Sequence, residues 1–202
     1  MREYVRFSKN RKLHGAIGIL FDIASYALCT LFCIILVCIY VLHFAAVQGD
    51  SMLPTLQSGN RLLVNALDRD PECGDVVIIT ALEAGLLRED GSPYPAVGLD
   101  KVIVKRVIAV AGQEIDIDSE TGTVYRDGMA LEEAYAVGST TEPILDGAFV
   151  YPITVPEGYV YVLGDNREVS MDSRYAEVGL VPLYQIEGKV ILRLNDKFGK
   201  IE

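Results

Sequence analysis

The feature that most constrains this chain is an apolar run of 25 residues at positions 23–47, interrupted only by Ser25, Thr30 and His43. As a helix the run would extend roughly 37 Å, enough to cross a hydrocarbon core of about 30 Å. The alternative is a cleaved signal peptide, whose apolar region is usually about 7–15 residues long. We therefore expect an uncleaved transmembrane anchor and not a wholly soluble protein.

Charge is divided by this run. Residues 1–14 carry a net charge of +4, whereas residues 48–202 hold 13 basic and 26 acidic side chains, a net charge of −13. The positive-inside rule predicts a cytoplasmic tail with the helix start (1–22), an anchor in the lipid bilayer (23–47) and an extracytoplasmic domain (48–202). Because an acidic domain has no basic surplus to neutralise phosphates, nucleic acid is excluded as a partner.

The outer portion has the composition of a mainly β domain, with short segments rich in Val, Ile and Tyr between turn residues. The predicted strands are residues 61–65, 75–80, 101–111, 114–117, 159–163 and 189–194. Asp127-Gly128 predicts a hairpin between residues 123–126 and 129–131. Residues 83–99 and 133–147 are predicted surface loops. We expect one transmembrane helix followed by a partly closed barrel or a pair of sheets.

The histidine inventory eliminates most hydrolytic sites. The chain has two histidines, His14 and His43, and neither lies in the outer domain. A Ser-His-Asp triad, a Cys-His pair and a His-ligated zinc are therefore unavailable there. A desolvated lysine is the main alternative base for activating a hydroxyl. We predict no cofactor and no metal.

A stiff segment with a candidate nucleophile follows the anchor directly. Residues 49–55 read Gly-Asp-Ser-Met-Leu-Pro-Thr, and Pro54 fixes its own φ and restricts Leu53. A nucleophilic serine needs such a stiff, exposed position, which makes Ser51 the candidate. The same composition is also typical of a plain turn where the chain leaves the membrane.

A lysine within an apolar strand is the candidate base. With a period of two, Lys105 shares a face with Ile103, Val107 and Ala109, while Arg106 points the other way. Desolvation, together with repulsion by Arg106, should lower the pKa of Lys105. To be mostly neutral near pH 8 it must fall by about 3 pH units, roughly 4 kcal/mol. The alternative is an edge-strand lysine that reaches water.

A dense polar segment, residues 164–174, follows the apolar strand predicted at 159–163. Its mixed Asp and Arg side chains with short hydroxyls could form a hydrogen-bonded shell that holds a catalytic lysine. The alternative is a solvated loop.

Together these segments resemble type I signal peptidases, the bacterial leader peptidases that use a Ser/Lys dyad, and most of all their Gram-positive members. The matching motifs occur in the family's order, and they are Ser51-Met52-x-Pro54-Thr55, Gly74-Asp75-Val76-Val77, Lys105-Arg106-Val107-Ile108 and Gly164-Asp165-Asn166-Arg167-x-x-Ser170-x-Asp172-Ser173-Arg174.

The resemblance implies that Ser51 is the nucleophile and Lys105 its general base. It also implies that the N–H of Ser51 lines an oxyanion hole. The surrounding substrate and oxyanion region consists of Gly49, Asp50, Met52 and Pro54. Gly49 stands where some relatives have a serine whose hydroxyl contributes to that hole.

The resemblance further assigns supporting roles around the base. Ser170 would hydrogen-bond the Lys105 amine. Asp165 would pair with Arg106, and Asp172 would pair with Arg174.

These implications predict a membrane-anchored serine endopeptidase. It would cleave signal peptides from secretory preproteins after small residues at the −1 and −3 positions, through an acyl-enzyme on Ser51. One rival is another Ser/Lys peptidase, such as the self-cleaving regulators related to repressors, which carry a DNA-binding module where this chain has an anchor. The rival from another class is a catalytically inert, anchored β-domain that binds an envelope partner. No oligomeric state is predicted.

Overall fold

The computed structural model describes residues 2–140, 147–194 and 199–200. The chain divides into two units, Met1–Leu42 and His43–Glu202. The first is a single helix, α1 (Arg2–Val41), of which Ile17–Val41 is long and apolar enough to cross a membrane. The helix ends six residues before the end of the predicted anchor, and Leu42–Ala46 forms strand β1. Apolar composition alone does not distinguish a helix from a strand in this run.

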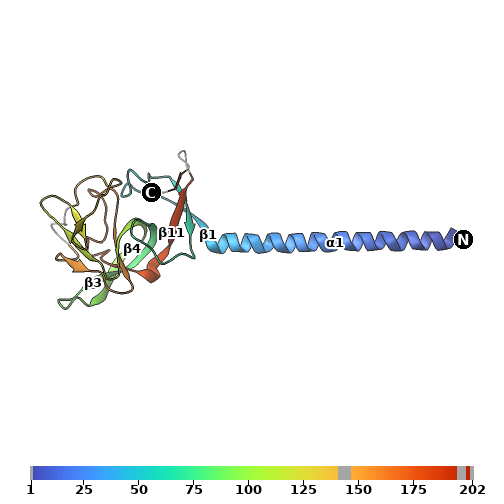
Figure 1. The fold of residues 1–202 in the computed structure, drawn as a ribbon, viewed down its shortest axis with the longest axis horizontal. Helices are drawn as coiled ribbons and strands as arrows, with labels where there is room; N and C mark the ends of the chain where they lie inside the picture. Colours follow the sequence, from blue (N-terminus) through green and yellow to red (C-terminus); the bar gives the residue numbers. More distant parts are fainter. Residues whose placement is uncertain (1, 141–146, 195–198, 201–202) are drawn as a thin grey trace. The chain divides into compact units, whose positions relative to one another are not determined.

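The second unit contains two antiparallel sheets (Figure 1). The larger has the order β1-β2-β11-β3-β4-β9-β10, with β12 paired to β11. The strands that follow β1 in this sheet are β2 (Arg61–Asn65), β3 (Val76–Leu87), β4 (Pro93–Val110), β9 (Tyr159–Leu163), β10 (Val181–Pro182), β11 (Ile186–Arg193) and β12 (Gly199–Lys200). A short 3-10 helix, η1 (Leu183–Gln185), precedes β11.

The smaller sheet has the order β7-β6-β5-β8. Its strands are β5 (Glu114–Ile117), β6 (Val124–Arg126), β7 (Met129–Ala130) and β8 (Ile153–Thr154). The predicted mainly β fold is therefore confirmed as a pair of sheets, which do not close into a barrel within the described ranges. Strands β2, β5 and β9 have the predicted bounds. The hairpin at Asp127-Gly128 is present, with both residues at positive φ.

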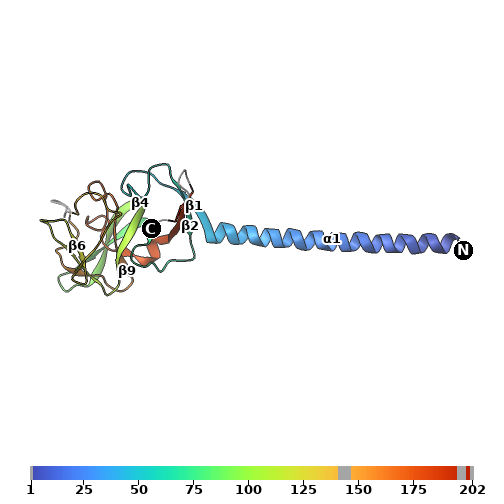
Figure 2. The same cartoon turned by 45° about the horizontal axis from the view of Figure 1, so that its top comes forward.

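The prediction of a surface loop at residues 83–99 is wrong. Strands β3 and β4 form a long hairpin in which pairing continues as far as Leu87 and Pro93. Figure 2 shows β4 beside β9, which pairs only with residues 106–110 of β4. At Pro93 and Pro95, the side of β4 that faces away from β3 therefore pairs with no described strand. The N–H group that each proline lacks is not needed for a hydrogen bond on that side. In the second predicted loop, residues 141–146 lie outside the described residues.

Three apolar clusters form the core, and strand β4, which carries the predicted base, contributes buried residues to two of them. Val107 belongs to a cluster with Val77, Ile79 and Val162. Ile108 and Ala109 both belong to a second cluster, which reaches the smaller sheet. The prediction that Ala109 shares the face of Lys105 is therefore wrong. The register of β4 against β9 shifts between Val107 and Ala109, and such a bulge interrupts the alternation of faces.

Candidate active site

The candidate nucleophile and base are in direct contact. Ser51 lies in the turn after β1, and Lys105 lies on β4, 54 residues later. Lys105 Nζ is 2.8 Å from Ser51 Oγ, a hydrogen-bonding distance. The fold thus brings together the two residues that sequence motifs singled out separately.

Lys105 is held in an apolar environment that weakens its affinity for a proton. Lys105 is only 3% exposed, and it pairs with Val77 on the neighbouring strand β3. Burial lowers the pKa of Lys105 from 10.5 to about 8, because an ammonium loses its hydration there. Within this net value, Asp172 and Asp165 raise the pKa of Lys105, whereas Arg174 lowers it in the same direction as burial. The alternative of a lysine that reaches water does not describe this side chain.

The turn that carries Ser51 is fixed from both sides. Gly49 has a φ of +87°, which favours glycine, and the Leu53–Pro54 peptide bond is cis. Met52 is buried in the third apolar cluster. On the other side, the Asn166 N–H donates to the Ser51 carbonyl at 3.0 Å. The N–H of Ser51 itself donates no hydrogen bond to any residue that the structure describes.

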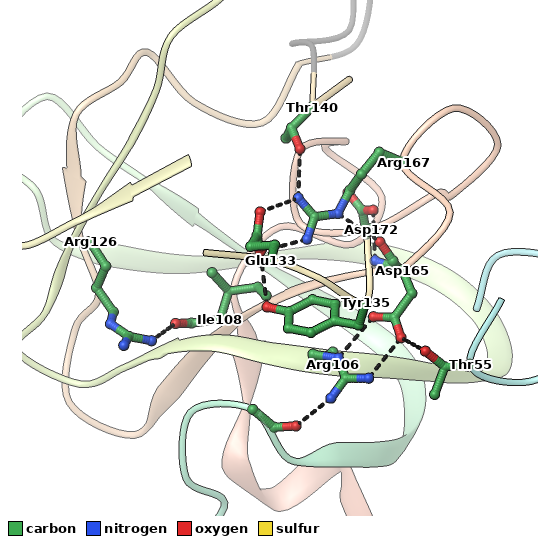
Figure 3. Close-up of polar contacts among 12 residues, drawn as sticks. Thr55, Arg106, Ile108, Arg126, Glu133, Tyr135, Thr140, Asp165, Arg167 and Asp172 are labelled. Atoms are coloured by element: carbon green, nitrogen blue, oxygen red, sulfur yellow. Dashed lines mark hydrogen bonds and ion pairs between the residues drawn. The ribbon is translucent and has the colours of Figure 1, made fainter. Parts of the chain in front are cut away.

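Arg106, the neighbour of Lys105 on β4, forms a buried bidentate ion pair with Asp165 (Figure 3). Arg106 donates from Nε to Oδ1 at 2.9 Å and from Nη2 to Oδ2 at 2.8 Å. Arg106 Nη1 also donates to the Gly74 carbonyl, and Asp165 accepts from the Thr55 hydroxyl. The pair therefore ties the Ser51 turn and the loop before β3 to the strand that carries Lys105.

Asp172 and Arg174 form the second expected pair, with 2.8 Å between Arg174 Nε and Asp172 Oδ1. Asp172 Oδ2 accepts from the Gly164 N–H at 3.0 Å, and Arg174 Nη2 donates to the Arg167 carbonyl at 2.8 Å. These side chains are buried, so the polar core of residues 164–174 is not solvated, although Glu168, Val169 and Met171 are exposed. The buried side chains form a folded shell around the dyad.

Ser170 differs from its expected role. It is buried, but its hydroxyl has no hydrogen-bond partner among the described residues, so the expected bond to the Lys105 amine is not formed. The hydroxyl packs against Gly164 instead. A Cβ at Gly164 would collide with Ser170 Oγ and would lie 2.5 Å from the Ser51 carbonyl oxygen. Close backbone approach therefore requires glycine at this position.

Sequence reasoning missed the segment that follows β7. Glu133, Tyr135 and Thr140 belong to a predicted surface loop, yet they contact Arg167 and Arg106 (Figure 3). No local pattern signals this role, because Glu133 and Tyr135 lie in a turn closed by the bond from the Ala136 N–H to the Glu133 carbonyl.

Two cavities of about 510 and 540 Å³ adjoin the dyad. Both are lined by Ser51 and Lys105 and by two further residues of β4, Lys101 and Ile103. Of the predicted substrate region, Gly49 and Asp50 line the first cavity and Met52 lines the second, whereas Pro54 lines neither. The walls are mixed, since apolar side chains such as Leu53, Leu99, Val169 and Met171 complete the first cavity.

Comparison with known proteins gives consistent matches. A family model described as "Signal peptidase, peptidase S26" matches residues 20–195. The chain is 36% identical over 151 residues to "Probable signal peptidase I-1" of Synechocystis, with 73% of this chain and 68% of that protein covered. It is 34% identical over 167 residues to "Signal peptidase I" of Bacillus caldolyticus, with 77% and 80% covered. Their similar identities do not single out a Gram-positive type.

Among solved structures, a crystal structure of a signal peptidase I from Enterococcus faecalis matches with a TM-score of 0.41 and 25% identity. This match covers 60% of this chain and 97% of that one.

Proposed function

We propose that this chain, which belongs to the signal peptidase family S26, removes signal peptides from exported preproteins through Ser51 and Lys105. The family is one of serine endopeptidases. The observation that carries the assignment of the dyad is the 2.8 Å contact between the Ser51 hydroxyl and a buried lysine amine. A lysine with a pKa of about 8 is neutral in about a tenth of molecules at pH 7 and in about half at pH 8, and a general base must be neutral to accept a proton.

The reaction follows from this contact. As Ser51 Oγ attacks the carbonyl carbon of the scissile peptide, its proton passes to the neutral Lys105 amine. The resulting ammonium returns that proton to the departing amine of the mature protein, which leaves an acyl-enzyme on Ser51. Lys105, neutral again, takes a proton from a water molecule that attacks the ester carbonyl. The ammonium then gives this proton to Ser51 Oγ as the bond to the acyl group breaks, which releases the signal peptide with a free carboxylate and restores both residues.

The oxyanion formed in both steps needs hydrogen-bond donors. The Ser51 N–H is the proposed donor, because it makes no other hydrogen bond in the described chain. The Asn166 N–H holds the Ser51 carbonyl at 3.0 Å and so orients the Ser51 backbone. Gly49 contributes no side-chain donor.

The proposed substrate preference is for small residues at the −1 and −3 positions. It rests on family membership. The two cavities beside Ser51 provide space next to the nucleophile, with side chains of Ile103, Leu99 and Val169 among their walls.

The membrane position supports the same function. Helix α1 ends ten residues before Ser51, and Ile17–Val41 could span the bilayer. So short a connection would keep the nucleophile near the membrane surface, where a preprotein anchored by its own apolar segment presents its cleavage site. The net charges of +4 on residues 1–14 and −13 on residues 48–202 favour a catalytic domain on the extracytoplasmic face. In intact protoplasts, a C-terminal tag should be digested by external protease, and a shielded tag would contradict this orientation.

The test of the function is cleavage of a preprotein by the full-length enzyme in detergent. We expect wild-type enzyme to release the signal peptide, and Ser51→Ala to abolish that release. Ser58→Ala, an exposed serine seven residues further on, should retain wild-type activity. An inert binding domain would produce no cleavage in any of the three proteins. Cleavage that survives in Ser51→Ala would reject Ser51 as the nucleophile.

A further inference from the structure

A buried ion pair outside the dyad links the segment after β7 to the catalytic shell. Arg167 donates to both carboxylate oxygens of Glu133, with distances of 2.9 Å from Nη1 and 2.7 Å from Nη2. The side chains are 1% and 11% exposed. Arg167 Nη1 also donates to the Thr140 hydroxyl. A pair so shielded from water is costly to break from one side, because the partner keeps an uncompensated charge.

Tyr135 connects this pair to the strand that carries the base (Figure 3). Its hydroxyl donates to Glu133 Oε1 at 3.0 Å. Its ring covers Arg106, whose Cζ lies 4.0 Å from the ring centroid. The Arg106 guanidinium therefore contacts both the Asp165 carboxylate and an aromatic face. Burial, and secondly the Glu133 charge, raise the pKa of Tyr135, so its hydroxyl remains a donor.

The backbone completes the connection to Ser51. The Val137 N–H donates to the Asp165 carbonyl at 2.8 Å, and the Arg167 N–H donates to the Val137 carbonyl at 2.9 Å. These two bonds enclose Asn166, whose N–H holds the Ser51 carbonyl. The Arg167 side chain also bonds the Gly164 carbonyl at 2.8 Å. Residues 133–137 thus hold residues 164–167 in place on both sides of Asn166, whose N–H orients the Ser51 backbone.

We propose that Glu133 and Tyr135 are positioning residues for the dyad, which act through Arg167 and Arg106 to keep Ser51 aligned with Lys105. Neither residue lines the two cavities at Ser51, so neither is expected to touch substrate. The inference rests on the proposed peptidase function. Their removal should therefore reduce the rate of the chemical step and leave substrate binding nearly unchanged, because a small misalignment of reacting groups is costly to rate.

The test compares variants of the full-length enzyme in detergent, with kcat and KM measured on a preprotein. Tyr135→Leu should lower kcat about tenfold and leave KM within about twofold. Tyr135→Phe keeps the ring over Arg106 and should stay within about twofold of wild type in kcat. Glu133→Gln leaves the Arg167 charge unpaired and should also lower kcat about tenfold. This substitution changes side-chain size little, so it remains informative if Tyr135→Leu fails to fold.

Matched controls separate positioning from general destabilisation. Tyr94→Leu removes a ring from Arg88, whose Cζ lies 5.1 Å from its centroid in the distal part of the hairpin. Glu187→Gln alters a glutamate on β11, which adjoins β3 on the side away from β4. This glutamate accepts a hydrogen bond from Thr80. Both should keep wild-type kcat, and thermal unfolding midpoints are recorded for every variant.

Three results would overturn the inference: wild-type kcat in Glu133→Gln and Tyr135→Leu, a loss confined to KM, or equal losses in the controls. A Tyr135→Phe enzyme as slow as Tyr135→Leu would reject the role of the ring over Arg106. An inactive wild-type enzyme, or one indifferent to Ser51→Ala, would contradict the proposed function itself and is recognised separately.

Discussion

Replacing Lys105 with methionine should abolish activity and yet stabilise the fold. Burial lowers the pKa of Lys105 from 10.5 to about 8, so the folded state resists protonation that the unfolded chain accepts. Below pH 8, the whole difference between the Lys105 pKa in the unfolded chain and in the folded state destabilises the fold, by about 3 kcal/mol at pH 7. The penalty shrinks as pH rises from 8 towards 10.5, because the unfolded chain then loses its proton too. Methionine has a similar length and carries no charge, so it avoids this penalty.

The assay is chemical denaturation of wild type and Lys105→Met in the same detergent across this pH range. The variant should be more stable by about 3 kcal/mol at pH 7 and by only about 1 kcal/mol at pH 10. Lys189→Met is the control, because Lys189 forms ion pairs with Asp68 and Asp75 and its pKa is raised. That variant should gain no stability. A Lys105→Met protein no more stable than wild type at pH 7 would refute the reasoning, as would a gain independent of pH.

Two further substitutions test the backbone around the dyad. Gly164→Ala should lower kcat about a hundredfold, because its Cβ would press on the Ser51 carbonyl, and steady-state kinetics on a preprotein will show this. Wild-type kcat in that variant would contradict the close approach. Ser170→Ala should retain full stability and near wild-type activity, since the hydroxyl it removes is buried without a hydrogen-bond partner in the described chain. A lower unfolding midpoint in thermal denaturation would show a bond that the structure lacks.

Much of the fold was predictable because local patterns govern it. The bounds of β2, β5 and β9 follow from apolar segments between turn residues, and the hairpin at Asp127-Gly128 follows from residues that tolerate positive φ. The long hairpin of β3 and β4 was not predictable from Gly and Pro content. Proline fits there because β9 leaves that edge of β4 unpaired, which is a property of the sheet and not of the segment.

The site shows the same division. Ser51 and Lys105 were candidates because of a stiff segment and an apolar strand, which are local properties of the sequence. Their roles as nucleophile and base were implied by the resemblance to type I signal peptidases. The placement of Ala109 failed because a bulge depends on pairing with another strand. Glu133 and Tyr135 escaped attention because their partners, Arg167 and Arg106, lie far away in the chain, and only the folded arrangement brings them together.

The pH dependence of kcat/KM for the wild-type enzyme tests the Ser51–Lys105 mechanism most directly. Lys105 accepts the Ser51 proton only when neutral, so kcat/KM should rise along an acid limb with a midpoint near the Lys105 pKa of about 8. Between pH 7 and pH 9 the increase should be about tenfold. Lys105→Arg, which keeps the charge and cannot deprotonate, should be inactive throughout this range. A flat profile from pH 7 to pH 9, or an active Lys105→Arg enzyme with the same limb, would contradict a lysine base at this site.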